Sequence, residues 1–247
     1  MKKYMTAFQM TQSMFCALPF PGKTWDETCR PYMLLFLPVV GLEIGTLWLG
    51  LDYLLVRFAV PALVYGLCMC ALPYLATGLM HLDGYMDVTD AIGSWGTLEK
   101  RRGILKDSHV GSFAVVRSIF LILAGFSMFA SFEAEDSRII LGLVPVVSRC
   151  CSALAILNLK PMNTSQYAGE KNYPKWHSII LTVVLISCLA AGFAIEVKNG
   201  LVILAVLAGY LLALRKSYTS LQGMNGDISG YCICISELCA AAAIALL

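Results

Sequence analysis

The fold is organised around residues 77–111, which begin T-G-L-M-H-L-D-G-Y-M-D-V-T-D-A-I-G and end, after a charged turn, K-D-S-H-V-G. Asp83, Asp87 and Asp90 are spaced i, i+4 and i+7. On a helix of about 3.6 residues per turn, this spacing puts three carboxylates on one narrow face. They repel one another, and no Lys or Arg shares the face. The face is therefore a solvated acidic surface, a capping cluster or a cation site.

A long apolar segment comes directly before the carboxylates. Residues 58–80 contain no charged side chain, and a helix needs about 20 such residues to cross a bilayer. The acidic face is thus expected where a membrane helix ends. Mg²⁺ is typically held by one or two carboxylates together with substrate phosphates. The pattern predicts a Mg²⁺ site for a phosphate-bearing substrate at a membrane surface.

The composition is that of an integral membrane protein. Of 247 residues, 58% are hydrophobic and 14% are charged, against roughly 25% charged in soluble domains. We expect one all-α domain over residues 1–247, a polytopic bundle of about seven transmembrane helices. The expected spans are 32–51, 58–80, 113–132, 139–157, 178–195, 201–214 and 228–247. The sixth is short, so it either tilts or extends through Ser217 and Tyr218.

Several other classes of protein and site are excluded. The net charge of +2 and the single basic run at residues 100–102 exclude a nucleic-acid partner. The ten cysteines lie mostly in apolar runs, as packing residues do, and three histidines are too few for a histidine-rich metal site. Residues 1–20 contain polar residues where a signal peptide would be apolar, so they predict an interfacial helix.

The basic residues predict the orientation in the membrane, because they are enriched in cytoplasmic loops. With seven spans and the N-terminus inside, the inner loops carry Lys2, Lys3, Lys23, Arg30, Lys100, Arg101, Arg102, Lys106, Lys160, Lys171, Lys175, Arg215 and Lys216. The outer loops carry only Arg57, Arg138 and Lys198. The acidic face, the 160–175 loop and the 223–227 turn would then all face the cytoplasm and meet there.

Three motifs carry a family resemblance. H-L-D-G-x-x-D-x-x-D followed by K-D-S-x-x-G resembles cobalamin synthase, the adenosylcobinamide-GDP ribazoletransferase or cobalamin 5'-phosphate synthase. A-L-P-F-P with L-P-V-V-G-L-E-I-G, at residues 17–21 and 37–45, and G-M-N-G-D-I-S-G, at residues 223–230, are similar to two further motifs of that family. The motifs follow in the family's order.

The resemblance implies roles for individual residues. Metal ligands would be Asp83, Asp87, Asp90 and Asp227. Substrate would be bound by Arg149, His109, Asn225, Gly226 and Glu237, although His109 and Asn225 stand where the family tends to have Arg and Thr. Lys106 would balance phosphate charge, and Asp107 or His81 would accept the proton. Asp227 has a second interpretation, as the N-cap of the last helix.

The implied reaction joins α-ribazole or its 5'-phosphate to adenosylcobinamide-GDP and releases GMP. Catalysis of such phosphoryl-type transfer consists mostly of positioning and charge neutralisation. Mg²⁺ is the expected cofactor and the lipid bilayer is the expected partner. Whether the protein forms a homo-oligomer is left open. The protein would belong to the bacterial cytoplasmic membrane, the cell inner membrane, with its active site facing the cytoplasm.

Two other classes of function remain open at this stage. CDP-alcohol phosphotransferases and prenyltransferases also place spaced Asp residues at helix ends, but the former carry D-G-x-x-A-R, which residues 83–88 do not match. A cation transporter would place its acids near the bilayer midplane on broken helices. The Asp cluster is expected at a membrane edge instead.

Overall fold

The computed structural model describes residues 2–22, 24–132, 138–162 and 173–247. These residues are helical, with one isolated β-bridge between Pro161 and Met224, and the predicted all-α membrane bundle is confirmed. Six helical segments are long and apolar enough to cross a membrane, and a bent pair of helices passes the same test when the two are taken together, which gives up to seven crossings. The straight crossings contain α3 (Leu37–Arg57), α7 (Ser112–Ala130), α8 (Val144–Asn158), α9 (Lys175–Ile195), α10 (Val197–Leu221) and α11 (Gly226–Leu246).

The second crossing is broken in the middle. Its two parts are α4 (Ala62–Ala76) and α5 (Met80–Gly93), which meet at 91°. Gly78 and Leu79, with φ of 61° and 65°, turn the chain there, a conformation that glycine adopts easily and leucine rarely. The predicted single span over 58–80 is therefore wrong. Because α4 alone, at about 1.5 Å per residue, is too short for a bilayer, the carboxylate helix α5 completes the crossing.

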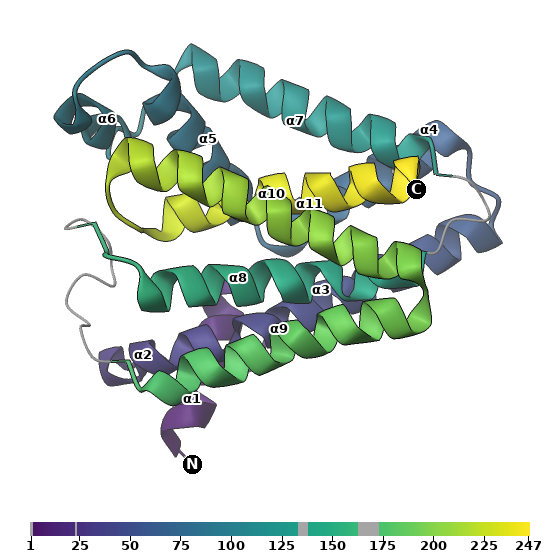
Figure 1. The fold of residues 1–247 in the computed structure, drawn as a ribbon, viewed down its shortest axis with the longest axis horizontal. Helices are drawn as coiled ribbons and strands as arrows, with labels where there is room; N and C mark the ends of the chain where they lie inside the picture. The colour runs from purple at the N-terminus through teal and green to yellow at the C-terminus, as the bar shows by residue number, and fades with distance from the viewer. Residues whose placement is uncertain (1, 23, 133–137, 163–172) are drawn as a thin grey trace.

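The long helices run along the bundle from one end to the other (Figure 1). The N-terminus lies near the end that carries α6 (Leu98–Ile104) and the α10–α11 turn, and the C-terminus lies at the opposite end. The sixth crossing, predicted to be short, is 25 residues long and extends past Tyr218. Of the segments used to predict orientation, Lys23, residues 133–137 and Lys171 lie outside the described residues.

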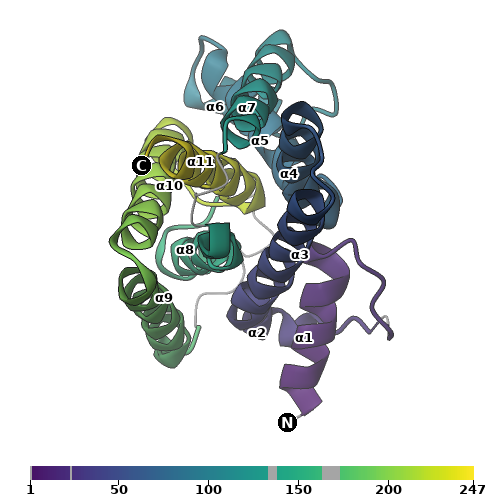
Figure 2. The same cartoon turned by 90° about the vertical axis from the view of Figure 1, so that its right-hand side faces the viewer.

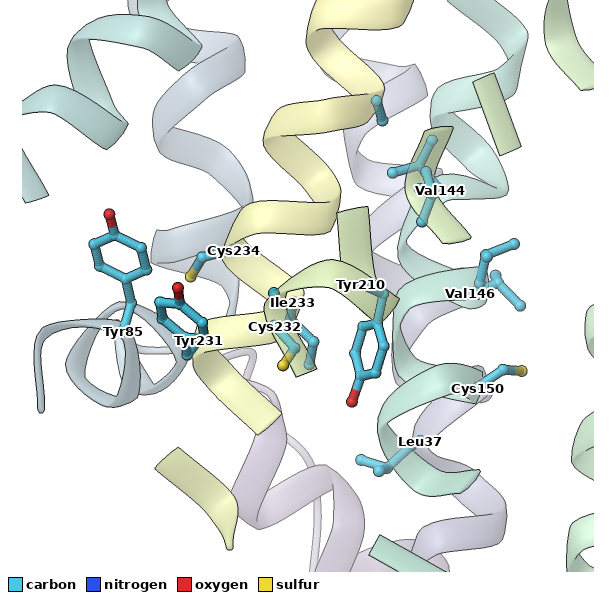
Figure 3. Close-up of a cluster of buried hydrophobic side chains, with 14 of the residues drawn as sticks. Leu37, Tyr85, Val144, Val146, Cys150, Tyr210, Tyr231, Cys232, Ile233 and Cys234 are labelled. Atoms are coloured by element: carbon cyan, nitrogen blue, oxygen red, sulfur yellow. The ribbon is translucent and has the colours of Figure 1, made fainter. Parts of the chain in front are cut away.

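Two helices form the centre of the bundle. Figure 2 shows α8 and α11 between the other helices, and 78% and 67% of their spanning residues are buried. Helix α3 packs closely on α8, because a Cβ on Gly41 or Gly45 would overlap the backbone of Pro145 or Gly142. On the other side of α11, Tyr231 stacks on Tyr85 of α5 with ring centroids 5.6 Å apart (Figure 3).

The N-terminal segment forms helix α1 (Lys2–Phe15), which is seen lengthwise in Figure 2 and so lies across the bundle axis. The Thr11 hydroxyl donates to the carbonyl of Met33 at 3.1 Å, and the Gln12 amide donates to Glu43. Directly after α1, the Ala17 N–H donates to the Ala76 carbonyl at 2.8 Å. These bonds hold α1 against α3 and against the break in the second crossing.

Candidate functional site

A cavity of about 280 Å³ lies beside the break between α4 and α5. Its wall comes from five helices that are distant in the sequence: α1, α3, α5, α8 and α11. The lining residues are Met14, Phe15, Leu37, Val40, Met80, His81, Asp83, Arg149, Ser152, Ile156, Gly226, Asp227, Ser229 and Ile233. Helices α1 and α3 contribute only apolar side chains. The polar and charged ones come from α5, α8 and α11.

Arg149 is the buried cation of this cavity. Its side chain is 1% exposed and forms an ion pair with Glu237 of α11. Ser148 joins the pair, accepting from Arg149 Nη1 at 2.9 Å and donating to Glu237 at 3.0 Å. Arg149 Nε and Nη2 have no hydrogen-bond partner among the described residues. Buried N–H groups are normally paired, so this guanidinium has two donors left for a ligand in the cavity.

The ion pair gives Glu237 a role other than the one that the family resemblance implied. Glu237 was expected to bind substrate, and the structure places it against Arg149 with 7% of its surface exposed. A buried charge is costly without a partner. Glu237 is therefore the counter-ion of the buried Arg149 guanidinium.

The predicted metal ligands gather where α5 meets the start of α11. Asp83 and Asp227 both line the cavity, and the charges of Asp83, Asp90 and Asp227 all act on Asp87. Gly84 makes the approach possible, because a Cβ there would lie 2.9 Å from the Asp227 Cα. The carboxylate of Asp90 points to Gly111, the residue before α7, where a Cβ would overlap it.

This donor set fits magnesium in a restricted sense. No three His, Cys, Asp or Glu side chains of the described residues lie close enough together to hold a metal ion by themselves. Mg²⁺ in substrate sites needs only one or two carboxylates, since waters and substrate phosphates complete its shell. Asp83 and Asp227 supply two such carboxylates on the wall of one cavity.

The predicted residues of the 106–111 loop do not line the cavity. Lys106, Asp107 and His109 are exposed on the surface between α6 and α7. Asp107 accepts from the His109 ring at 2.7 Å and from its backbone N–H at 3.0 Å, and these bonds lower the pKa of Asp107. Of the two candidate proton acceptors, only His81 lies on the cavity wall.

The start of α11 is capped by Asn225. Its side-chain oxygen accepts from the Ile228 N–H at 3.0 Å, and its amide donates to Asp227 Oδ2 at 2.6 Å. The interpretation of Asp227 as N-cap is therefore wrong, because the helix begins at Gly226, earlier than the sequence pattern indicated. Asp227 lies in the first turn instead. Its carboxylate is held by Asn225, and Gly226 lies at the exposed edge of the cavity.

Sequence reasoning missed most of the apolar lining and both serines of the cavity. The hydroxyls of Ser152 and Ser229 are hydrogen-bonded to each other inside the cavity, and Met14 and Phe15 close it from α1. Ser152 had a detectable signal, because it lies one helical turn after Arg149 and extends a polar stripe on an apolar helix. Ser229 had none, because a residue two positions after Asp227 points to a different face of the helix. The role of α1 had no such signal.

Comparison with known proteins decides the family. The family described as Cobalamin-5-phosphate synthase matches residues 7–245. The chain belongs to this family. Its curated relatives include adenosylcobinamide-GDP ribazoletransferases of Clostridium perfringens, 32% identical over 96% of each chain, and of Clostridium botulinum, 29% identical over 96% of each chain. The ribazoletransferase of Geobacillus kaustophilus is 31% identical over 93% of this chain and 91% of its own.

The family resemblance predicted from the three motifs is thus confirmed, and with it the prediction that this cobalamin synthase homologue is a transferase. No solved structure matches the chain. The roles of single residues therefore depend on the cavity geometry described above.

Proposed function

We propose that this member of the cobalamin synthase family transfers α-ribazole, or α-ribazole 5'-phosphate, to adenosylcobinamide-GDP. The observation that carries the proposal is that a cationic side chain and two carboxylates line the same cavity. Arg149 offers two unused N–H donors there, and Asp83 and Asp227 offer carboxylates. A cation with planar donors binds phosphate, and carboxylates hold the metal that accompanies it. Relatives named for this reaction match nearly the whole chain.

The reaction is a displacement at phosphorus. A ribose hydroxyl of α-ribazole attacks the cobinamide-side phosphorus of adenosylcobinamide-GDP. A new P–O bond forms to the ribose, the P–O bond to GMP breaks, and GMP leaves with the bonding electrons. The hydroxyl proton passes to His81, the candidate base on the cavity wall. In the 5'-phosphate substrate the 5'-oxygen is already esterified, so a hydroxyl of the ribose ring is the nucleophile in both forms.

The chain's own charges position the phosphates. Arg149 offers Nε and Nη2 to oxygens of the substrate in the cavity, and Glu237 holds the guanidinium in place. Lys106 and His109 lie on the loop that ends at Gly111, beside Asp90, and attract the nucleotide at the surface. Mg²⁺, held by Asp83 and Asp227 with Asp87 and Asp90 nearby, would supply charge neutralisation for the pyrophosphate.

The site is proposed to face the cytoplasm from a bacterial cytoplasmic membrane. The exposed basic residues Lys100, Lys106, Arg215 and Lys216 lie at the end of the bundle that carries α6 and the α10–α11 turn. The opposite end carries Arg57 at the end of α3, Arg138, and Lys198 in the first turn of α10. This asymmetry is typical of an inner face at the α6 end, which is also the end where α11 begins and where Asp227 lies.

The test is GMP release by the protein purified in detergent or lipid nanodiscs. Adenosylcobinamide-GDP with α-ribazole and Mg²⁺ should yield one GMP for each cobamide formed. Omission of either substrate should abolish the product. CMP release from a CDP-alcohol with a second alcohol, in place of GMP release, would instead support the CDP-alcohol phosphotransferases. Absence of both products from folded protein would reject the proposal.

A further inference from the structure

The cavity has two chemically different parts. Helices α1 and α3 contribute Met14, Phe15, Leu37 and Val40 to it and no polar side chain. Helix α8 contributes Arg149 and Ser152, and α11 contributes Asp227 and Ser229. A ligand that fills the cavity must therefore have a flat or compact apolar part and a polar part that accepts hydrogen bonds.

The volume limits the size of this ligand. At about 280 Å³, the cavity is just below the roughly 300–1,000 Å³ of ordinary small-molecule sites. A base joined to a ribose is of that size. A corrinoid that carries a nucleotide is much larger and cannot enter.

The buried end of the cavity can bind a hydrogen-bond acceptor, either a ribose oxygen or a phosphate. Arg149 is 1% exposed, and its Nε and Nη2 have no partner among the residues that the structure describes. The hydrogen-bonded hydroxyls of Ser152 and Ser229 lie on the same wall. At the other extreme, Asp83 and Gly226 are exposed and mark the mouth.

We propose that this cavity is the subsite of the smaller substrate alone. It takes an aromatic N-riboside with the base against Phe15 and Val40 and with its ribose, or a phosphate on the ribose, toward Arg149. The corrinoid substrate stays outside and presents only its pyrophosphate to Asp83 and Asp227 at the mouth. The inference rests on the proposed function and adds to it a division of the two substrates between the cavity and the surface.

A direct consequence is that the riboside binds without the corrinoid. The test is equilibrium dialysis of labelled α-ribazole against the whole protein in nanodiscs, with no corrinoid present. Val40→Phe places a ring in the apolar part, whereas Val39→Phe is a matched control because Val39 is 37% exposed and does not line the cavity.

We expect Val40→Phe to weaken α-ribazole binding about ten-fold or more, which corresponds to about 1.4 kcal/mol. The KM for adenosylcobinamide-GDP should stay close to that of the parent protein. Val39→Phe should change neither value.

Because Val40 is 1% exposed, its replacement by Phe can also disturb folding. A second pair of variants on α1 avoids this problem. Met14→Trp fills the cavity from a half-buried position, and Ser13→Trp, at an exposed neighbour, is the control. Thermal midpoints of all four variants identify any that are misfolded.

The inference is overturned if Met14→Trp or a folded Val40→Phe raises the KM for the corrinoid and leaves α-ribazole binding unchanged. It is also overturned if the parent protein binds α-ribazole only after the corrinoid. Failure of the proposed function gives a different result, because dialysis needs no turnover. In that case the riboside still binds in a Met14-dependent manner, but no GMP appears with both substrates present.

Discussion

Gly84 of α5 lies directly against Asp227 of α11, so close that a Cβ at residue 84 would be 2.9 Å from both the Asp227 Cα and its carbonyl oxygen. One turn earlier on α5, the backbone of His81 makes the same kind of contact with Gly230, and the Cys234 thiol donates to the His81 carbonyl at 3.3 Å. The two helices therefore approach through two small residues. This approach brings the Asp83 and Asp227 carboxylates, 144 residues apart in sequence, to one cavity.

Gly84→Ala should push the two helices apart. The added Cβ meets backbone atoms, which cannot rotate away, and overpacking of this kind costs about 1–3 kcal/mol. We expect a lower thermal midpoint and a large loss of GMP release. Gly50→Ala in α3 is the control, because a Cβ there meets nothing within 4 Å. If Gly84→Ala turned over at the parent rate, the α5–α11 contact would not be needed for the site.

Substitutions in the Arg149–Glu237 ion pair should change stability and activity independently. Removing one partner, as in Arg149→Met or Glu237→Leu, leaves a buried charge alone and should cost about 3–5 kcal/mol. The double variant Arg149→Met with Glu237→Leu buries no charge, so its thermal midpoint should recover. We expect it to release no GMP, because the phosphate ligand is gone. A stable and active double variant would reduce Arg149 to a structural residue.

Variants of Asn225 and Asp227 should have different effects on the thermal midpoint and on GMP release. Asn225→Ala removes the N-cap of α11 and should cost about 1 kcal/mol, which Asn225→Ser restores. Asp227→Asn leaves the Asn225 cap of α11 in place, so its thermal midpoint should stay unchanged while GMP release falls. If Asp227→Asn lost stability and kept its turnover number, the capping and ligand roles would have to be exchanged.

The number of crossings could be predicted from composition, because long uncharged runs must be helical in a bilayer. The break in the second crossing could not. Its sequence shows Pro73 and Gly78, but the turn also needs a positive φ at Leu79, which no local preference favours. The Ala17–Ala76 hydrogen bond and the packing of α1 at this point help to hold it. Tertiary contacts therefore decide the break.

The break also weakens the sequence argument against a cation transporter. A cation transporter was disfavoured because its acids should lie near the bilayer midplane on broken helices, whereas the Asp cluster was expected at a membrane edge. In the structure Asp83 lies in the first turn after a break. The family match over residues 7–245, and not the position of the Asp cluster, is therefore what separates this protein from cation transporters. Among the site residues, the spacing of the Asp cluster predicted a shared helix face, and all three Asp residues do lie in one helix, α5. The Arg149–Glu237 pairing depends on α8 meeting α11, which periodicity cannot show.

The orientation can be tested with single cysteines in a cysteine-depleted background. Ser108→Cys lies on the loop between α6 and α7, and Lys198→Cys lies at the other end, at the start of α10. An impermeant thiol reagent added to intact cells should label only the second. Labelling of Ser108→Cys from outside would invert the topology and move the carboxylate end of the bundle to the wrong side of the membrane.

The most direct measurement is the Mg²⁺ dependence of GMP release in Asp83→Asn and Asp227→Asn, compared with Asp52→Asn. Asp52 accepts from the Tyr65 hydroxyl at 2.6 Å and pairs with Arg138, away from the cavity, so it controls for the loss of a carboxylate in a spanning helix. We predict that the first two variants fold normally and lose turnover by about 100-fold or more, since a ~3 kcal/mol loss of transition-state stabilisation has that effect. Asp52→Asn should retain the parent rate and the parent Mg²⁺ dependence. Parent-like rates at limiting Mg²⁺ in both cavity variants would contradict the assignment of this cavity as the place where GMP is released.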